Sequence, residues 1–477
     1  MSSEDHAPRS PSFAQRLFQP IDIASLVVFR IAFGSIMTWE ALRYLVPRVP
    51  DGISWARQFY IDPQILFKYY GFAWVHPWPG DGMIYHFWAW ALAGVCVTVG
   101  FCYRLIAIVL CLLVTHVFLL DHTRYLNHLY LICLLSFLII FLPFHRAASI
   151  DAKLWPSIRG GFAPTWMLYL LRFQMGLVYV FSGIARANGD WMHGEPMRTW
   201  FRSRGAESVF SPILMSEWAP YFFSFGGMFF DLLIVPLLLW RRTRAVAFVA
   251  AVSFHLANAY LFHIGVFPWL GIAATTLFLE PDWPRRAWGW GRSNPAAEAA
   301  SPVEGGAFAV HRGVLAAIGV YAVVQLLVPL RHWLYPGSVN WTNEGHNFAW
   351  RMKLDDRHTR VRVEVVNPAT GERQRVDLNQ FLTGRQQHVM STRPDLLVQF
   401  AHHVADYYQR EFSTSARPAV YAEVELSLNG RPMKPLIDPA IDLASRRVSL
   451  KPADWIVRQE LEPLGASHGA DARSFGE

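Results

Sequence analysis

Charged residues and cysteine are both scarce in this 477-residue chain. Only 17% of its residues are charged, whereas charged residues make up about a quarter of a typical soluble domain. Hydrophobic residues account for 53% and the mean hydropathy is +0.21, which excludes a wholly soluble enzyme and a disordered chain. All four cysteines lie in or beside apolar runs. We therefore expect neither a disulfide framework nor a metal site.

Lysine is also rare, with five residues among the 43 basic ones, so arginine supplies the other 38. The net charge of +7 is not arranged as the basic stripe that nucleic-acid binding requires, so nucleic acid is not an expected partner. The first 20 residues are polar and show no cleavable signal pattern. We expect the first apolar segment to act as an uncleaved signal-anchor.

Long apolar runs, by contrast, fill most of the chain. A helix needs about 20 mostly apolar residues to cross a bilayer, and nine stretches meet or approach this length. They cover residues 22–46, 84–101, 104–120, 127–144, 165–186, 219–240, 244–262, 264–281 and 311–330. The sequence thus predicts an α-helical polytopic membrane protein with about nine transmembrane helices embedded in lipid.

Arginine and lysine are concentrated in alternate loops. If nine helices alternate, all these loops fall on one side together with the N-terminus; their basic residues are Arg104, Arg146, Lys153, Arg159, Arg241, Arg242, Arg244, Arg285, Arg286 and Arg292. The excess of positive charge in cytoplasmic loops predicts that this side is cytoplasmic. The odd number of helices then places the C-terminal region on the extracytoplasmic face.

The composition becomes that of a soluble domain after the last apolar run. Residues 360–366 and 419–428 alternate polar and apolar side chains, as half-buried strands do. Asn429-Gly430 favours a hairpin turn, and Thr392 is expected to cap a helix. The predicted parts are a cytoplasmic tail (1–21), a transmembrane bundle (22–335) and a small extracytoplasmic α+β domain (336–477).

Polar residues inside the predicted bundle fall into two groups. Ionisable residues at membrane depth are costly and usually face the interior, so we expect Arg30 or Arg172 to pair with Asp231 and fix helix packing. The second group lies near the outer helix ends, where it could form a pocket: Asp121, Asn127, His128, Arg186, Asp190, His255 and Asn258. Taken singly, each of these residues could instead be an interfacial cap or a satisfied core residue.

Seven short motifs occur in one order along the chain. They are Asp121-His122-Thr123 to Asn127-His128, Leu171-Arg172 through Tyr179 and Gly183 to Asp190-Trp191, Gly226-Gly227 to Asp231, Phe254-His255 to Asn258, Asp282-Trp283-Pro284, Asn340-Trp341-Thr342-Asn343 to Trp350, and Asp438-Pro439 to Asp442. This set resembles the vitamin K-dependent gamma-carboxylases. The resemblance is greatest to bacterial members with a horizontally transferred transmembrane domain, and it covers residues 29–449.

The resemblance implies a chemistry and a location. Enzymes of this family oxidise vitamin K hydroquinone with O2 to the epoxide, which produces a base strong enough to remove a γ-proton from a protein glutamate. The resulting carbanion then adds CO2. The implied cofactors are a menaquinol-type hydroquinone, O2 and CO2, and the implied partner is a glutamate-containing protein outside a bacterial inner membrane.

The resemblance also places the family's base lysine at Arg186. Arginine stays protonated in proteins and cannot act as a general base. Three interpretations remain open: a quinol-dependent enzyme in which His128 or His255 takes the proton while Arg186 stabilises the quinolate, a catalytically silent member that binds quinone or a protein, and a transporter or assembly factor that shares only the fold. An enzyme that forms epoxide without fixing CO2 would be an uncoupled oxygenase.

The candidate catalytic residues are therefore Arg186 and His128. Candidates for binding the quinone are Asn127, Tyr179, His255, Asn258 and Asp121.

Overall fold

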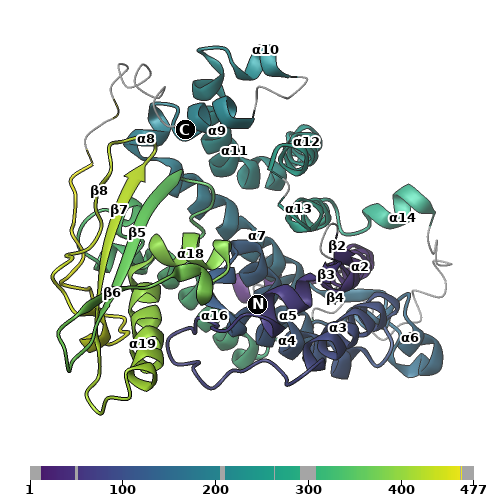
Figure 1. Ribbon diagram of the computed structural model, residues 1–477. Coiled ribbons are helices and arrows are strands. Elements are labelled where there is room, and N and C mark those ends of the chain that lie inside the picture. Colours follow the sequence, from purple (N-terminus) through teal and green to yellow (C-terminus); the bar gives the residue numbers. More distant parts are fainter. Residues whose placement is uncertain are drawn as a thin grey trace, which may run out of the picture.

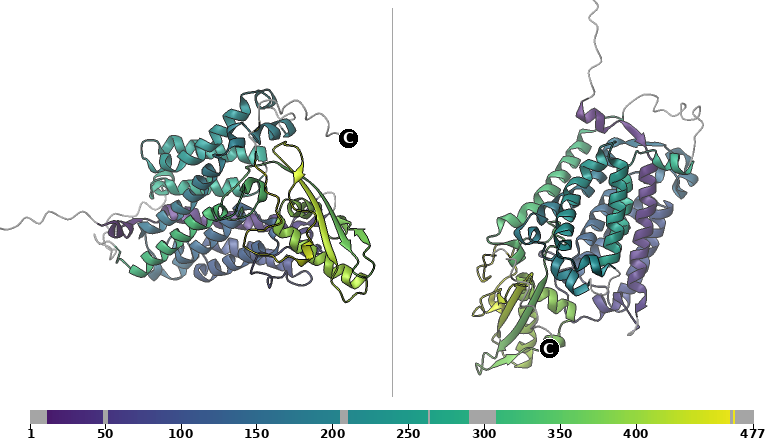
Figure 2. Two further views of the ribbon diagram at one scale, coloured as in Figure 1. Left: turned by 90° about the vertical axis from the view of Figure 1, so that its left-hand side faces the viewer. Right: turned by 90° about the horizontal axis from the view of Figure 1, so that it is seen from above.

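A computed structural model describes residues 12–48, 52–204, 210–262, 264–289, 308–461 and 464. Long helices lie side by side in a bundle, and a smaller domain containing a sheet covers one end of it (Figures 1 and 2). The first described residues lie toward the opposite end of the bundle (Figure 2). The chain is an integral membrane protein with a sheet-containing C-terminal region.

Seven helices of the described chain are long and apolar enough to cross a membrane. They are α2 (Ala24–Leu45), α3 (Gly82–Val99), α4 (Tyr103–Leu120), α7 (Thr165–Arg186), α11 (Ala219–Leu239), α12 (Arg244–Phe262) and α16 (Arg312–Leu330). Two more apolar helices, α5 (Asn127–Phe141) and α13 (Phe267–Thr275), correspond to the other two predicted spans.

Seven of the nine predicted spans are thus full-length apolar helices in the described chain, and the other two are shorter than predicted. The 15 residues of α5 extend about 22 Å at 1.5 Å per residue, short of the bilayer core of about 30 Å. This helix ends just before Pro143, and α13 begins only at Phe267, with Pro268 in its first turn. Proline favours helix boundaries at both positions because it lacks an N–H donor.

Shorter elements connect the long helices. The short helices are α1 (Phe13–Leu17), α6 (Ile150–Leu154), α8 (Gly189–Met192), α9 (Met197–Arg204), α10 (Ser211–Leu214), α14 (Trp283–Trp288) and α17 (Val339–Thr342). Two-stranded pairs join β1 (Pro20–Asp22) to β4 (Phe162–Pro164) and β2 (Pro47–Arg48) to β3 (Ile53–Ser54).

The arginine-rich loops gather at the end of the bundle away from the C-terminal domain. Arg285 contacts Asp22 at 2.6 Å beside the β1–β4 pair, and Arg244 contacts Glu280 at 2.6 Å. The nitrogen of Ser25, at the start of α2, donates to the Pro281 carbonyl, so these loops lie together. The alternation predicted from the apolar runs is thus present in the fold.

The C-terminal domain is built on a four-stranded antiparallel sheet in the order β6-β5-β7-β8. Its centre is the pair β5 (Arg357–Val366) and β7 (Ala419–Leu428), flanked by β6 (Arg373–Arg375) and β8 (Lys434–Pro435). The helices α18 (Gly384–Ser391) and α19 (Pro394–Glu411) pack against the sheet (Figure 1). The prediction of a cap at Thr392 is wrong by one residue, because Thr392 ends α18 and Arg393 caps α19.

Asp190 and Trp350 make two of the contacts that fix this domain to the bundle. The carboxylate of Asp190, after α7, accepts hydrogen bonds from Arg431 at 2.5 and 2.7 Å and from the amide of Asn429 at 2.7 Å. Trp350 is fully buried in the core of the bundle, 5.0 Å from the ring of Tyr130. The predicted Asn429-Gly430 turn therefore lies at the interface between the two parts.

Candidate functional site

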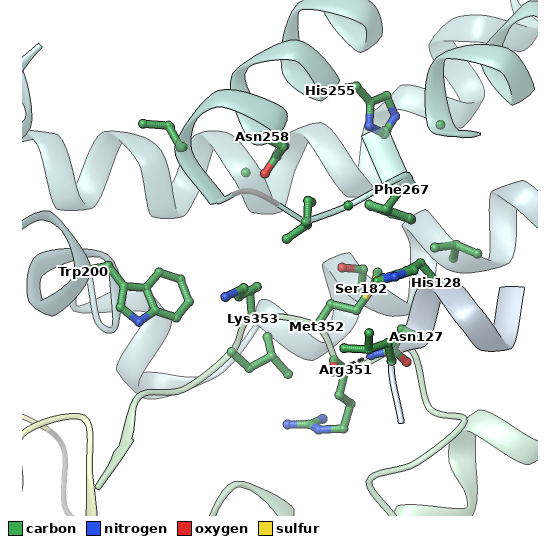
Figure 3. Close-up of a pocket in the computed structure, with 18 of the residues that line it drawn as sticks. Asn127, His128, Ser182, Trp200, His255, Asn258, Phe267, Arg351, Met352 and Lys353 are labelled. Carbon is green, nitrogen blue, oxygen red and sulfur yellow. Dashed lines mark hydrogen bonds between the residues drawn. The ribbon is translucent and has the colours of Figure 1, made fainter. Parts of the chain in front are cut away.

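A cavity of about 1090 Å³ lies where the membrane helices meet the C-terminal domain. Figure 3 shows it between helices of the bundle and the loop that carries residues 351–353. Much of its wall is apolar, with Met175, Val178, Phe222, Phe223, Phe230, Phe254 and Phe267 among the lining residues. This is the size and character of a site for an apolar ligand.

Helix α7 presents three polar side chains to the cavity. Tyr179, Ser182 and Arg186 fall on one helical face because they are spaced by three and four residues. The Arg186 guanidinium donates to the Asp231 carboxylate of α11 and to the Ser182 hydroxyl, and it lies 5.0 Å from the Trp191 ring. Asp231 and Arg186 thus form a buried ion pair in the cavity wall.

The predicted pairing of Asp231 with Arg30 or Arg172 is therefore wrong. Arg30 donates to the carbonyls of Phe144 at 2.8 Å and Ala148 at 2.6 Å. Arg172 binds the carbonyls of Leu277 at 2.8 Å and Leu279 at 3.0 Å. Carbonyls at helix ends and in tight loops lack backbone partners, and both arginines supply them. These two residues stabilise the helix ends and lie outside the cavity lining.

Tyr179 and His255 form another buried polar pair in the cavity wall. The tyrosine hydroxyl lies 2.7 Å from Nε2 of His255, whose side chain is 1% exposed. The other imidazole nitrogen, Nδ1, has no hydrogen-bond partner within the described part of the chain. A Cβ on Gly271 would lie 2.3 to 2.7 Å from the imidazole atoms, so this glycine makes room for the ring.

His128 lines the same cavity from the start of α5. The rings of His128 and His255 each lie 6.1 Å from the ring of Phe267 (Figure 3). Among the described residues, His128 has no side-chain hydrogen bond. Its imidazole is therefore available to a ligand.

The two candidate asparagines differ in their hydrogen bonds within the protein: both amide atoms of Asn127 are bonded, whereas for Asn258 a bond is made by the amide nitrogen. The Oδ1 atom of Asn127 accepts from the Tyr125 hydroxyl at 2.9 Å, and its Nδ2 donates to the Arg351 carbonyl at 3.2 Å. Asn127 therefore links the bundle to the C-terminal domain. Asn258 donates to the Phe254 carbonyl at 2.9 Å, while its oxygen faces the cavity in Figure 3.

Asp121 lies outside the cavity lining, contrary to its predicted role in binding quinone. Its carboxylate accepts the N–H of Thr123 at 3.0 Å, the Thr123 hydroxyl at 2.8 Å and the N–H of Phe67 at 3.3 Å. These bonds cap a short 3-10 helix after α4, as Asp does at helix starts. Asp121 is a local structural residue.

The C-terminal domain contributes a loop that the sequence did not mark as part of the site. Arg351, Met352, Lys353 and Asp355 line the cavity, and Lys353 is its only lysine within the described chain. Trp350 and Lys353 have φ values of 54° and 50°, a strained conformation that often occurs at functional sites. The Nζ atom of Lys353 lies 5.6 Å from the Trp200 ring.

The electrostatic environment of this loop is set by burial and by arginine. Burial lowers the pKa of Arg351 to about 10, and its guanidinium donates to the Asn340 side chain. Burial, together with nearby Arg393 and Arg351, holds the pKa of His346 well below its ordinary value. His346 is therefore neutral where it lines the cavity, and the rim of the site owes its positive charge to arginine and lysine.

Comparison with known families accounts for nearly the whole described chain. Residues 18–283 match the HTTM domain, and residues 310–462 match the lumenal domain of vitamin K-dependent gamma-carboxylase. The chain belongs to the vitamin K-dependent gamma-carboxylase family. No solved structure matches it.

In this gamma-carboxylase family member, the cavity lies where the two matched regions meet. Tyr179, Arg186 and His255 come from the HTTM domain, whereas Arg351 and Lys353 come from the lumenal domain. Neither region alone encloses the site. The family assignment supports a carboxylase-type membrane enzyme.

Proposed function

We propose that this gamma-carboxylase family member oxidises a reduced vitamin K, of the menaquinol type, with O2 and uses the reaction to carboxylate glutamate in a protein substrate. The observation that carries the proposal is the cavity of about 1090 Å³ between the membrane helices and the lumenal domain. A lipid-soluble quinol could enter from the membrane side, and a polypeptide could approach from the lumenal-domain side.

The lining fits an aromatic quinol with a hydrophobic tail. Phe230, Phe254 and Phe267 provide apolar surface for a ring or an isoprenoid chain. The unpartnered Nδ1 atom of His255 is a buried polar atom that a ligand oxygen would satisfy, and Asn258 offers a second polar contact. When bound, the quinol supplies the reducing power and, through its oxidation, the strong base that the carboxylation requires.

We assign the first proton transfer to His128. Arg186 cannot accept a proton, and its guanidinium is already bound to Asp231 and Ser182. His255 is already hydrogen-bonded to Tyr179, whereas the His128 imidazole is available in the cavity. Arg186 then stabilises negative charge that develops on the ligand oxygen, and the His255–Tyr179 pair orients the ligand.

We further propose a bacterial inner membrane location, with the N-terminus in the cytoplasm and the C-terminal domain outside. The arginine-rich loops at one end of the bundle support this orientation, since positive loops remain cytoplasmic. The glutamate-containing protein would then meet the enzyme at the extracytoplasmic face.

A catalytically silent family member that binds quinone or a protein is the second candidate. It is favoured by the Arg186–Asp231 ion pair, which fills the family's base position with a cation that cannot be deprotonated. In this case the cavity would hold the ligand without turning it over. A transporter or assembly factor with the same fold would need no quinone at all.

The purified protein should be incubated with reduced vitamin K, O2, labelled CO2 and a glutamate peptide, and both products should be measured. The proposal predicts epoxide and carboxylated peptide, with both lost in His128→Ala. Epoxide without CO2 fixation would indicate an uncoupled oxygenase. Saturable quinone binding without either product would support the silent member. In that case Arg186→Lys would test whether an amine at position 186 restores turnover.

A further inference from the structure

A second cavity, of about 450 Å³, lies on another side of the junction between the bundle and the C-terminal domain. It shares only His346 with the larger cavity. Its walls come from residues 68–72, Arg331 just after α16, residues 342–348, the start of α19 and the segment 446–456. The function proposed above makes no use of this cavity.

The lining of the second cavity carries an excess of positive charge. Three carboxylates line it, Glu344, Asp395 and Asp454. Six basic side chains line it, so the formal excess is +3: Lys68, Arg331, Arg393, Arg446, Arg447 and Lys451. Arg393 lies 3.3 Å from Asp395, and Arg446 lies 3.6 Å from Asp454.

The other four cations, Lys68, Arg331, Arg447 and Lys451, form no ion pair within 4 Å in the described chain. The N-terminus of α19 adds to the positive potential, because Arg393, Pro394 and Asp395 at its start line the cavity. The cavity is therefore suited to an anion.

The cavity lies at the depth where the membrane helices end. Leu119, in the last turn of α4, and Arg331, just after α16, both line it. Large apolar side chains at its rim are exposed: Tyr70 is 57% exposed and Leu450 is 60% exposed. Trp333, two residues after Arg331, is 67% exposed. Aromatic residues beside basic ones are typical of the boundary between lipid tails and headgroups.

We propose that this cavity binds the phosphate of an anionic phospholipid headgroup. The excess cations would neutralise the phosphate, and the exposed Tyr70 and Leu450 side chains would contact the upper part of the acyl chains. A zwitterionic headgroup would bind less well because its own cation meets the same positive wall. A lipid held here would contact both Arg331, just after α16, and the C-terminal domain, and so would stabilise the junction between the bundle and that domain.

The test compares the full-length protein in nanodiscs of phosphatidylcholine alone with nanodiscs that also contain phosphatidylglycerol. The variant Arg447→Gln/Lys451→Gln removes two exposed cavity cations without disturbing the core. The variant Arg375→Gln/Lys434→Gln removes the same charge from exposed positions on the sheet. Native mass spectrometry then counts the lipids retained by each protein, and a thermal scan measures stability.

We expect the wild type to retain phosphatidylglycerol selectively and to be stabilised by it. The cavity variant should retain it at least about fivefold less, and the matched sheet variant should behave as the wild type does. Equal retention by both variants would overturn the proposal. The proposal would also be overturned if inorganic phosphate displaced the bound lipid as effectively as a soluble glycerophosphate does, because the cavity would then be a site for free anions. Displacement by an acidic peptide would also overturn it and would assign the cavity to polypeptide binding.

Discussion

The ion pair between Arg186 and Asp231 gives the most quantitative prediction. The two side chains are only 12% and 5% exposed, so Arg186→Met would leave a buried carboxylate whose remaining partner is the Ser182 hydroxyl. Breaking one side of a buried ion pair costs about 3–5 kcal/mol, whereas replacing both partners by apolar residues is often close to neutral. We expect about 3 kcal/mol of destabilisation, because Ser182 compensates for part of the loss.

The assay is a double-mutant cycle with Arg186→Met, Asp231→Leu and the double variant. Free energies of unfolding would be measured by titration with SDS in mixed micelles. The double variant should lie within about 1 kcal/mol of the wild type, since no buried charge remains. The exposed pair of Arg362 and Glu423, at 52% and 63% exposure, serves as the control and should contribute less than about 1 kcal/mol.

A loss below about 1 kcal/mol in Arg186→Met would refute this reasoning. So would a double variant whose loss equals the sum of the two single losses. Either result would mean that Arg186 and Asp231 do not interact strongly in the wall of the cavity.

Three further predictions concern other parts of the molecule. Gly271→Ala should cost about 1–3 kcal/mol by overpacking and weaken quinone binding in a fluorescence titration, because the new methyl meets the His255 ring. Burial and nearby arginine hold the pKa of His122 well below its ordinary value, so only the unfolded state gains a proton below about pH 6.5. The contribution of His122 to the free energy of unfolding should be fully present above that pH and fall with acidification. His122→Gln should reduce this fall by up to about 1.4 kcal/mol per pH unit; an unchanged slope of the unfolding free energy against pH would contradict this. Arg431→Met should speed proteolytic release of the C-terminal domain, since it leaves the Asp190 carboxylate, which is 7% exposed, without its bidentate partner; an unchanged cleavage rate would show that other contacts suffice.

The sequence predicted which segments form helices and strands better than it predicted the lengths of the helices or which polar residues pair. Every predicted apolar stretch contains a helix, because long apolar runs have few other stable forms in a membrane. Alternation predicted strands at residues 360–366 and 419–428, and the structure confirms the second and begins the first three residues earlier, at Arg357. Two of the predicted helices are shorter than expected because hydropathy alone does not show where α5 and α13 begin and end.

The residues of the site were predictable in part, but their arrangement was not. The family resemblance pointed to Tyr179, Arg186, His128 and His255, and the structure places all four in the lining of one cavity. The partner of Asp231 could not be identified, because apolar periodicity does not reveal which helices are neighbours. Lys353 was missed because its entry into the cavity depends on a left-handed backbone and on the docking of a separate domain.

Photolabelling with a quinone analogue tests the central claim most directly, that one quinol site is formed by both halves of the chain. Labelled peptides would be mapped by mass spectrometry after irradiation in lipid nanodiscs, with and without excess vitamin K. The account predicts competable labels on α7 and α12, near Tyr179 and His255, and on the loop that carries Met352 and Lys353. Labels confined to the outward-facing surface of α16, or labels that excess quinone does not displace, would contradict it.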